Sequence, residues 1–139
     1  GEVPVYEVVE YREDGSDLIF GTTTIAPGQV GGEYFMTRGH FHLRADLGEI
    51  YNTTAGEGLL LLRSRDFETR ALKMLPGSCA FLPPGWAHRS VNVGKVPLVF
   101  FWCCDPATGT DYGDIAEHGM GLRAFDEAGN VSLQRAAAP

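Results

Sequence analysis

The sequence predicts an all-β protein, a single domain folded as a β-sandwich or β-barrel. The 139 residues are 44% apolar, which suffices for one compact core but not for two ordinary domains. Gly and Pro, with 18 and 8 copies, recur at short intervals. Between them lie short stretches rich in β-branched and aromatic residues, and no stretch before residue 110 has the period of a long amphipathic helix.

The expected strands follow one another closely along the chain. They are residues 5–11, 18–25, 33–37, 49–54, 58–64, 68–74, 78–83, 89–93, 97–104 and 131–135. Short strands at this spacing are typical of sandwiches and barrels. We expect "DYGDIAEHG", residues 111–119, to form one helical turn or a loop.

Charge and composition narrow the classes of partner. The net charge is −7 and the only lysines are Lys73 and Lys95, which argues against a basic face for nucleic acid. A small anionic substrate stays compatible, because a phosphate needs only a few local donors. No apolar run approaches the roughly 20 residues of a membrane span, and residues 1–11 do not resemble a secretion signal. We therefore expect a cytoplasmic protein with neither a membrane nor a nucleic-acid partner.

Three cysteines, Cys79, Cys103 and Cys104, make an odd count without the pair spacing of a zinc site. We expect buried reduced thiols, in keeping with the burial of most free cysteines, and a redox role is the minor alternative.

The stretch "TRGHFHLRADLGEIY", residues 37–51, places two histidines two positions apart and a glutamate seven positions later. On a strand, His40 and His42 share one face and Phe41 points to the other, which suits a two-imidazole metal chelate. Glu49 would reach the same pocket from the next strand. Taken alone, the pattern also fits exposed strand histidines beside a surface glutamate.

A second stretch, "GSCAFLPPGWAHRSVN", covers residues 77–92. Pro83, Pro84 and Gly85 predict a tight turn that delivers His88 to the barrel interior. A lone histidine here would more often be a core residue. Because it follows a stretch that already offers His40, His42 and Glu49, His88 becomes a candidate fourth ligand.

Together the two stretches resemble the two motifs of the cupins, small jelly-roll β-barrels with an internal metal. The second motif matches throughout, and in the first motif six residues separate His42 from Glu49, a longer gap than in most cupins. This gap, together with "TDYGDIAEHG", resembles the cupin-type glucose-6-phosphate isomerases of archaea and some bacteria, over about Val5 to Leu133. The resemblance implies a single cupin domain over residues 1–139, without the N-terminal extension of that family, which carries one substrate-facing tyrosine.

The resemblance implies one divalent metal per chain and a sugar-phosphate substrate. Iron(II) is the family's usual metal, with zinc, nickel or manganese as alternatives, and three imidazoles with one carboxylate fit such metals without selecting one. The implied ligands are His40, His42, Glu49 and His88. The implied phosphate end is lined by Thr23, Thr37, the backbone at Gly39 and Tyr51, and Tyr112 lies near the sugar. Arg38 is a candidate for a charge-assisted hydrogen bond to the phosphate.

The implied reaction moves hydrogen between C1 and C2 of an open-chain sugar phosphate, converting glucose 6-phosphate and fructose 6-phosphate into one another. Either a base removes the C2 proton and a cis-enediol forms, or a hydride moves directly between the carbons. Glu49 is the obvious base, but ligation to a metal weakens a carboxylate as a base. Tyr51 is a candidate for holding or relaying a proton at O1 or O2, and Tyr112 completes the predicted catalytic set.

Two positions depart from the resemblance. The family usually has histidine where this chain has Thr110 and tyrosine where it has Cys104. These departures keep open a cupin that binds metal and sugar without turnover. A metal-dependent cupin oxygenase also stays open, because such enzymes likewise hold iron with histidines and glutamate. The resemblance also implies a homodimer, for which the alternating strand near the N-terminus would offer a free edge.

Overall fold

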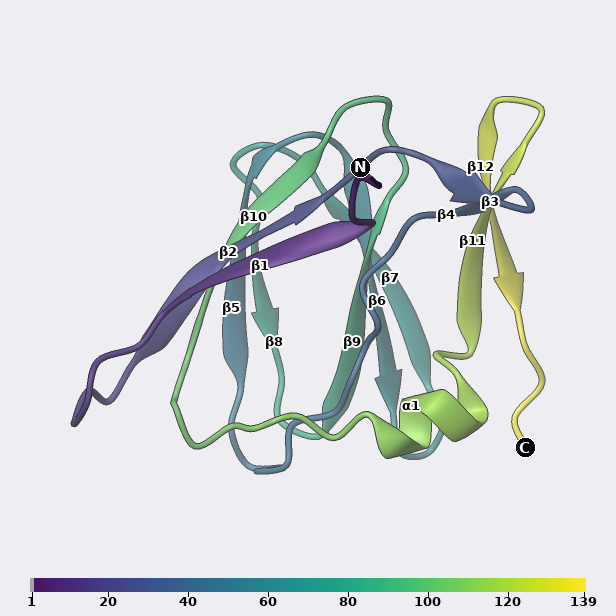
Figure 1. Cartoon of the computed structure of the whole chain (residues 1–139). Coiled ribbons are helices and arrows are strands. Elements are labelled where there is room, and N and C mark those ends of the chain that lie inside the picture. Colours follow the sequence, from purple (N-terminus) through teal and green to yellow (C-terminus); the bar gives the residue numbers. More distant parts are fainter. Residues whose placement is uncertain (1) are drawn as a thin grey trace.

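The computed structural model describes residues 2–139 and confirms the all-β prediction (Figure 1). Its strands are β1 (Tyr6–Tyr11), β2 (Ile19–Ile25), β3 (Gln29–Val30), β4 (Glu33–Tyr34), β5 (Glu49–Ala55), β6 (Gly58–Ser64), β7 (Thr69–Met74), β8 (Cys79–Leu82), β9 (Trp86–Asn92), β10 (Leu98–Cys104), β11 (Leu122–Glu127) and β12 (Asn130–Arg135). One short helix, α1 (Gly113–His118), lies where a helical turn or loop was expected.

Two antiparallel sheets enclose the main core. One has the strand order β1-β2-β10-β5-β8, and the other has the order β7-β6-β9. Along β2 and β10 every second residue is buried, because alternate side chains point into the barrel. The resulting core includes Ile25, Leu60, Leu82, Leu98 and Phe100, each at most 1% exposed. Burying one such side chain contributes roughly 1.5–3 kcal/mol.

A third layer covers the outer face of the β7-β6-β9 sheet. The strands β12, β11, β4 and β3 form a separate sheet, and α1 lies beside the end of the barrel (Figure 1). Phe41, Leu61, Ile115, Met120 and Leu122 pack together in this second core. The layer therefore ties the segment that follows β10 to the back of the barrel.

Some elements differ from the sequence prediction. The prediction missed β3 and β11, and the expected strand at 33–37 shortens to β4, followed by an isolated bridge from Met36 to Val91. β11 reads "LRAFDE", and it is recognisable only through its pairing with β12, because charged residues occupy half of it. Short strands of this kind gain their stability from their neighbours rather than from their own sequence.

The cysteine prediction holds in part. Cys104 is buried, Cys103 is half-buried and Cys79 is exposed, and all three are free. Burial was wrong for Cys79, because β8 is an edge strand and Cys79 lies on its exposed face.

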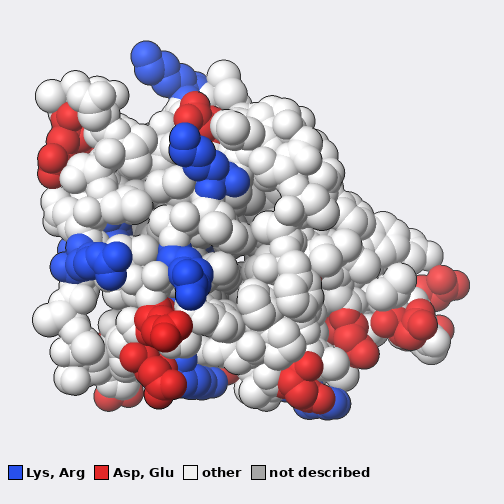
Figure 2. All heavy atoms as spheres, turned by 180° about the vertical axis from the view of Figure 1, so that it is seen from behind, with Lys and Arg blue, Asp and Glu red and all other residues white. Residues whose placement is uncertain are grey.

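The charged side chains are dispersed. On the face seen in Figure 2, basic side chains stand in separate spots, and acidic ones lie both toward the projecting β1–β2 hairpin and on the opposite side of the molecule. Among residues 2–139, no helix is both long enough and apolar enough to cross a membrane.

Candidate active site

The segment that carries the first two histidines is extended, but it is not the regular strand that the sequence predicted. Among residues 2–139 its pairing with other strands is limited to isolated bridges, in which His40 pairs with His88 of β9 and Phe41 pairs with Asp111. The N–H of His40 donates to the carbonyl of His88 at 3.2 Å, and the N–H of His88 donates back at 3.1 Å. As predicted, Phe41 points away from the histidines and into the second core.

Gly39 enables the sharp approach of this segment to β9. Its φ is +79°, a backbone conformation that favours glycine. A Cβ at this position would lie 3.3 Å from the Cβ of Arg89 and 3.4 Å from the carbonyl oxygen of His88. A side chain would therefore push the ligand segment away from the strand that carries His88.

Glu49 and His42 meet across the loop that connects them. Glu49 opens β5, and its side chain points inward. Its Oε1 lies 3.0 Å from Nε2 of His42, and the carbonyl of Leu47 lies 2.8 Å from Nδ1 of the same ring. Both ring nitrogens of His42 therefore face acceptors, which is the arrangement of a doubly protonated imidazole.

His88 reaches the interior as the proline and glycine turn predicted. Gly85, with φ of +80°, follows the two prolines, and β9 begins at Trp86, three residues earlier than expected. The His88 ring lies 4.5 Å from the His40 ring and 5.2 Å from the His42 ring, measured between centroids. The turn and the register of β9 thus bring the fourth candidate ligand beside the other three.

The four donor groups fit one metal ion. One ligand atom each from His40, His42, Glu49 and His88 can be chosen so that all lie within 4.8 Å of one another. Nε2 of His88 is buried, and among residues 2–139 it has no hydrogen-bond partner. A buried nitrogen without a partner costs about 1–3 kcal/mol, and coordination to an ion would remove that cost. Three nitrogens and one carboxylate are suitable ligands for a borderline divalent metal.

Burial keeps two of the imidazoles neutral. Desolvation, together with the nearby His42, lowers the pKa of His40 to about 4. Desolvation, with His40 and His42 nearby, lowers the pKa of His88 well below 6.5. For His42, burial alone would lower the pKa, but the hydrogen bonds to Glu49 and Leu47 outweigh it and raise the pKa above 6.5. The neutral rings have lone pairs ready for a metal.

The four groups open into a cavity of about 460 Å³. All the residues that the sequence predicted for substrate binding and catalysis line it: Thr23, Thr37, Arg38, Gly39, Glu49, Tyr51 and Tyr112. The structure thus brings the predicted set around one space, and the roles of these residues stay predictions.

Two tyrosines occupy different parts of the wall. Tyr51 is buried on β5, and its ring lies 5.7 Å from that of His88. Burial, and then the charges of Glu49 and Cys104, raise the pKa of Tyr51 well above 10.0, so it stays a neutral hydrogen-bond donor. Tyr112 lies nearer the surface, 5.4 Å from His40 between ring centroids, with the guanidinium carbon of Arg38 4.2 Å from its own ring centroid.

The two departures from the resemblance also line this cavity. Thr110 is exposed on the wall, whereas Cys104 is buried with Sγ 3.4 Å from Oγ1 of Thr108. Burial raises the pKa of Cys104 to about 11, so this thiol is a neutral wall group. The departures thus change the wall and leave the four candidate ligands unaltered.

Sequence reasoning missed Tyr6, Trp102 and Thr108, which line the same cavity. Tyr6 opens β1, and its pairing with Ile25 of β2 sets it at the cavity. Alternation along β1 was the available signal, because it shows that Tyr6, Val8 and Glu10 share a face. It did not show which face turns inward.

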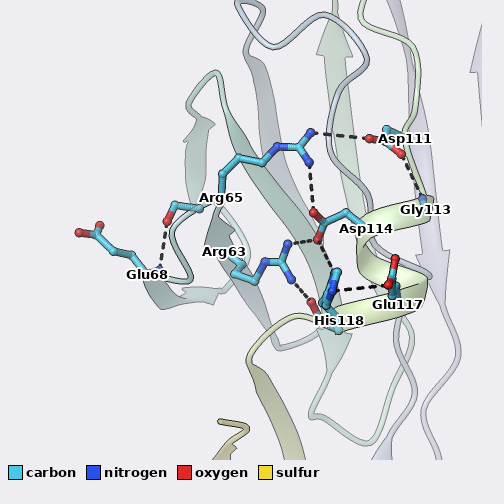
Figure 3. Close-up of polar contacts among 10 residues, drawn as sticks. Arg63, Arg65, Glu68, Asp111, Gly113, Asp114, Glu117 and His118 are labelled. Carbon is cyan, nitrogen blue, oxygen red and sulfur yellow. Dashed lines mark hydrogen bonds and ion pairs between the residues drawn. The ribbon is translucent and has the colours of Figure 1, made fainter. Parts of the chain in front are cut away.

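A cluster of charged residues supports this wall from behind (Figure 3). Arg63 of β6 is fully buried; it bonds the carboxylate of Asp114 and donates to the carbonyl of Gly119 at 2.6 Å. Arg65 pairs with Asp114 and with Asp111, at 3.2 and 3.6 Å. Asp111 is bonded through its backbone to Phe41. The cluster therefore links α1, the wall beside Tyr112 and the ligand segment.

Comparison with known structures gives the fold class. The structure matches a recombinant oxalate oxidase in complex with glycolate with a TM-score of 0.64, at 18% identity, over 77% of this chain and 54% of that chain. It matches the oxalate decarboxylase of Lactobacillus farciminis in a formate complex equally well, at 17% identity, over 79% and 31% of the two chains. At this identity the likeness shows the fold alone, and that fold is the cupin jelly roll.

Comparison of the sequence gives the family. The family profile described as "Glucose-6-phosphate isomerase (GPI)" matches residues 1–138. The chain is 42% identical over 136 residues to the glucose-6-phosphate isomerase of Thermococcus litoralis, which covers 96% of this chain and 72% of that protein. With the enzyme of Sinorhizobium medicae it is 47% identical over 126 residues, or 88% and 59% of the two. The chain belongs to the glucose-6-phosphate isomerase family, in its cupin form.

The protonation of the histidines predicts how metal affinity depends on pH. His40 and His88 are neutral at pH 7, whereas His42, whose pKa is raised above 6.5, must release a proton to bind a metal. We expect the affinity to rise with pH until His42 is deprotonated, with release of about one proton per ion near pH 6.5. Calorimetry in buffers of different ionisation enthalpy measures this number. Release of two or more protons would show that the buried histidines are charged.

The ion pair between the buried Arg63 and the partly exposed Asp114 predicts a change in the free energy of unfolding. Asp114→Asn leaves Arg63 without its charged partner, so we expect a loss of about 3 kcal/mol in the free energy of unfolding. Glu117→Gln, on the same helix but exposed, is the matched control, and its effect should be under about 0.5 kcal/mol. Urea denaturation of the metal-free protein at pH 7 measures both changes.

The same ion pair fixes the pH dependence of that loss. Burial would raise the pKa of Asp114, but the hydrogen bond and charge of Arg63, with Arg65 and His118, lower it below 3.8. A carboxylate whose pKa is lower in the folded than in the unfolded protein stabilises the fold at pH values above the unfolded-state pKa. This stabilisation is lost as the pH falls through the folded-state pKa. The difference in free energy of unfolding between wild type and Asp114→Asn should therefore become smaller below pH 3.8. A gap that stays constant there would exclude the ion pair as its source.

Proposed function

We propose that this protein is a metal-dependent isomerase that interconverts glucose 6-phosphate and fructose 6-phosphate. The observation that carries the proposal is the convergence of His40, His42, Glu49 and His88 at the floor of a cavity that Thr23 and Tyr51 also line. The relatives named glucose-6-phosphate isomerase match nearly the whole chain, and this match includes both histidine-bearing stretches.

One divalent metal per chain is part of the proposal, with iron(II) preferred and zinc, nickel or manganese as alternatives. When bound, the ion would act as a Lewis acid that stabilises negative charge on the two oxygens of an open-chain sugar. The three histidines and Glu49 would hold it, because their donor atoms share one small space. The solved oxalate decarboxylase of Bacillus subtilis is described as containing Mn(II) centres, which concerns that protein alone.

The protein's own side chains would handle the proton. Both routes to the product need a group that gives or takes a proton at O1 or O2 of the sugar. Tyr51 suits this role, because its raised pKa keeps the phenol protonated next to the ligands. Glu49 contacts His42 and lies 3.8 Å from Nε2 of His88, so we assign it to the metal first. Tyr112 and Arg38 stack at the mouth, where the rest of the sugar would lie.

The phosphate end would lie beside Thr23, Thr37 and Gly39. Hydroxyl and backbone N–H groups make directional bonds to phosphate oxygens, and Arg38 adds a charge-assisted donor. All four residues line the cavity, and Thr23 projects inward from β2. The net charge of the chain is −7, so local donors rather than overall charge would attract the anion.

We also propose a homodimer, because one face of the five-stranded sheet exposes an apolar row. The register places Tyr11, Phe20, Cys103, Ile50 and Phe81 side by side across all five strands. Phe81 is 63% exposed and Tyr11 52%, and Tyr11 stacks on Phe20 at 5.0 Å. A second copy of this chain could cover the row, and β1 also leaves a free edge. The cytoplasmic location expected from the sequence stays a prediction.

The isomerase proposal is tested by metal analysis followed by a coupled assay from fructose 6-phosphate to glucose 6-phosphate. We expect metal-loaded wild type to turn over, and we expect His88→Ala to lose metal and activity together while the barrel stays folded. His118→Ala removes an imidazole outside the cavity and is the matched control. Metal without turnover would favour the binding-only cupin, and dioxygen consumption would favour the oxygenase. Full metal and rate in His88→Ala would contradict the four-ligand site.

The dimer proposal is tested by light scattering on the eluting protein. We expect twice the 15.1 kDa mass of one chain. Phe81→Ser should shift the protein toward one chain, because it replaces the most exposed aromatic ring of the apolar row with a hydroxyl. Val131→Ser, on the exposed β12, is the control and should leave the mass unchanged. A wild type with the mass of a single chain would reject the proposal.

A further inference from the structure

Arg89 lies outside the cavity but bonds a segment that forms part of its wall. Its side chain leaves β9 next to the candidate ligand His88. Its Nε donates to the carbonyl of Thr37 at 3.1 Å, and its Nη2 donates to the carbonyl of Arg38 at 2.6 Å. Thr37 and Arg38 line the cavity, whereas Arg89 does not. The backbone carbonyls of Thr37 and Arg38 therefore point toward the guanidinium of Arg89, which lies outside the cavity.

The direction of these carbonyls matters for an anion. A carbonyl oxygen repels the oxygens of a phosphate, whereas N–H and O–H groups attract them. Because the guanidinium binds the carbonyls of residues 37 and 38 with two donors, it fixes the peptide planes on this stretch. The segment can then turn its donors, rather than its acceptors, toward the cavity.

The hydroxyl of Thr37 is set in the same way by the next residue of β9. The N–H of Ser90 donates to Oγ1 of Thr37 at 3.0 Å, and the N–H of Thr37 donates to the carbonyl of Ser90 at 2.9 Å. A hydroxyl that already accepts one bond keeps its own proton for another acceptor. Thr37 is therefore held as a donor at the cavity wall.

Arg89 also places a positive charge behind this segment. Among residues 2–139 no carboxylate lies within ion-pair distance of it, and the nearby Glu33 is paired with Arg123. Burial lowers the pKa of Arg89, which means that its charge is partly desolvated. An anion bound on the other side of the segment would relieve that cost. Gly39 permits the contact, because a Cβ there would lie 3.2 Å from Nε of Arg89.

We propose that Arg89 is the positioning residue for the phosphate end of the substrate, which it organises through the backbone of Thr37 to Gly39. The proposal rests on the sugar-phosphate isomerase function proposed above. It adds a residue that does not touch the substrate, and it assigns the strand β9 two tasks. His88 faces the metal site, while Arg89 and Ser90 hold the phosphate donors.

The test compares Arg89→Met and Arg89→Lys with wild type, all metal-loaded. Metal content, the dissociation constant of inorganic phosphate by calorimetry, and KM and kcat for fructose 6-phosphate are measured. For Arg89→Met we expect the dissociation constant of phosphate and KM to rise about tenfold, because charge-assisted hydrogen bonds that orient the donors are lost. We expect kcat to change by less than about threefold and one metal per chain to remain, because the loss is confined to binding.

Conservative and matched variants separate positioning from general stability. Arg89→Lys keeps the charge but not the two-pronged donor, so we expect an effect between wild type and Arg89→Met. Arg70→Met removes the same side chain from β7, outside the cavity, and should change none of the four quantities. If Arg89→Met does not fold, Arg89→Lys decides the test, and a phosphate dissociation constant equal to that of wild type would overturn the proposal.

Two outcomes with Arg89→Met would also overturn it. One is a phosphate dissociation constant within about twofold of wild type, since that change is smaller than one hydrogen bond contributes. The other is a parallel loss of metal and phosphate affinity, which would assign Arg89 to the whole site rather than to its phosphate end. Failure of the proposed isomerase function has a different signature, namely no turnover by metal-loaded wild type, and phosphate calorimetry decides the role of Arg89 in that case as well.

Discussion

The site depends on the pairing of one irregular segment with one strand. Met36, Thr37 and His40 pair with Val91, Ser90 and His88, so the register of this contact sets the spacing between the candidate ligands and the proposed phosphate donors. In an extended chain a slip of one residue turns every side chain to the opposite face. Here such a slip would move His40 out of the cavity and Phe41 into it. The second core holds the register, because Phe41 packs there. Its backbone N–H and carbonyl are both hydrogen-bonded to the backbone of Asp111.

Desolvation governs the chemistry of the cavity floor. Burial keeps His40 and His88 neutral, while the hydrogen bonds to Glu49 and Leu47 keep a proton on His42. Glu49 thus faces one protonated imidazole and two neutral ones. A divalent ion would replace the proton of His42 and satisfy the buried nitrogen of His88 that has no partner in the described part of the chain. The floor is therefore built for a positive charge that the side chains supply only in part.

Two arginines, the fully buried Arg63 and the half-buried Arg89, organise the walls from outside. Arg63 holds α1 through Asp114 and Gly119, and Arg89 holds the segment before His40 through two carbonyls. A buried guanidinium is costly unless its donors are used, so each one favours a single arrangement of the backbone around it. This explains how a small domain can hold short, irregular segments around a cavity. The irregular segments are placed by hydrogen bonds to the strands of the sheets.

Much of the fold and most of the site could be predicted from local patterns. Stretches rich in β-branched and aromatic residues gave strands such as β2, β5 and β10, and the spacing of His40, His42, Glu49 and His88 gave the candidate ligands. The missed features, among them β11, depend on partners far away in the sequence. Tyr6 was missed for the same reason. β1 has no buried face of its own, and only its pairing with β2 turns this residue toward the cavity.

The sequence by itself determined the residue types and their spacing, and with them the family and the set of donors. Only the tertiary structure decided where these groups stand. It set the bridge that replaces a strand at His40, the two carbonyls held by Arg89, and the ion pairs of Arg63 behind the wall. The physical reason is that hydrogen bonds and desolvation depend on which groups meet in space. Arg89 and Thr37, for example, are 52 residues apart in the chain and become partners only when β9 is in register.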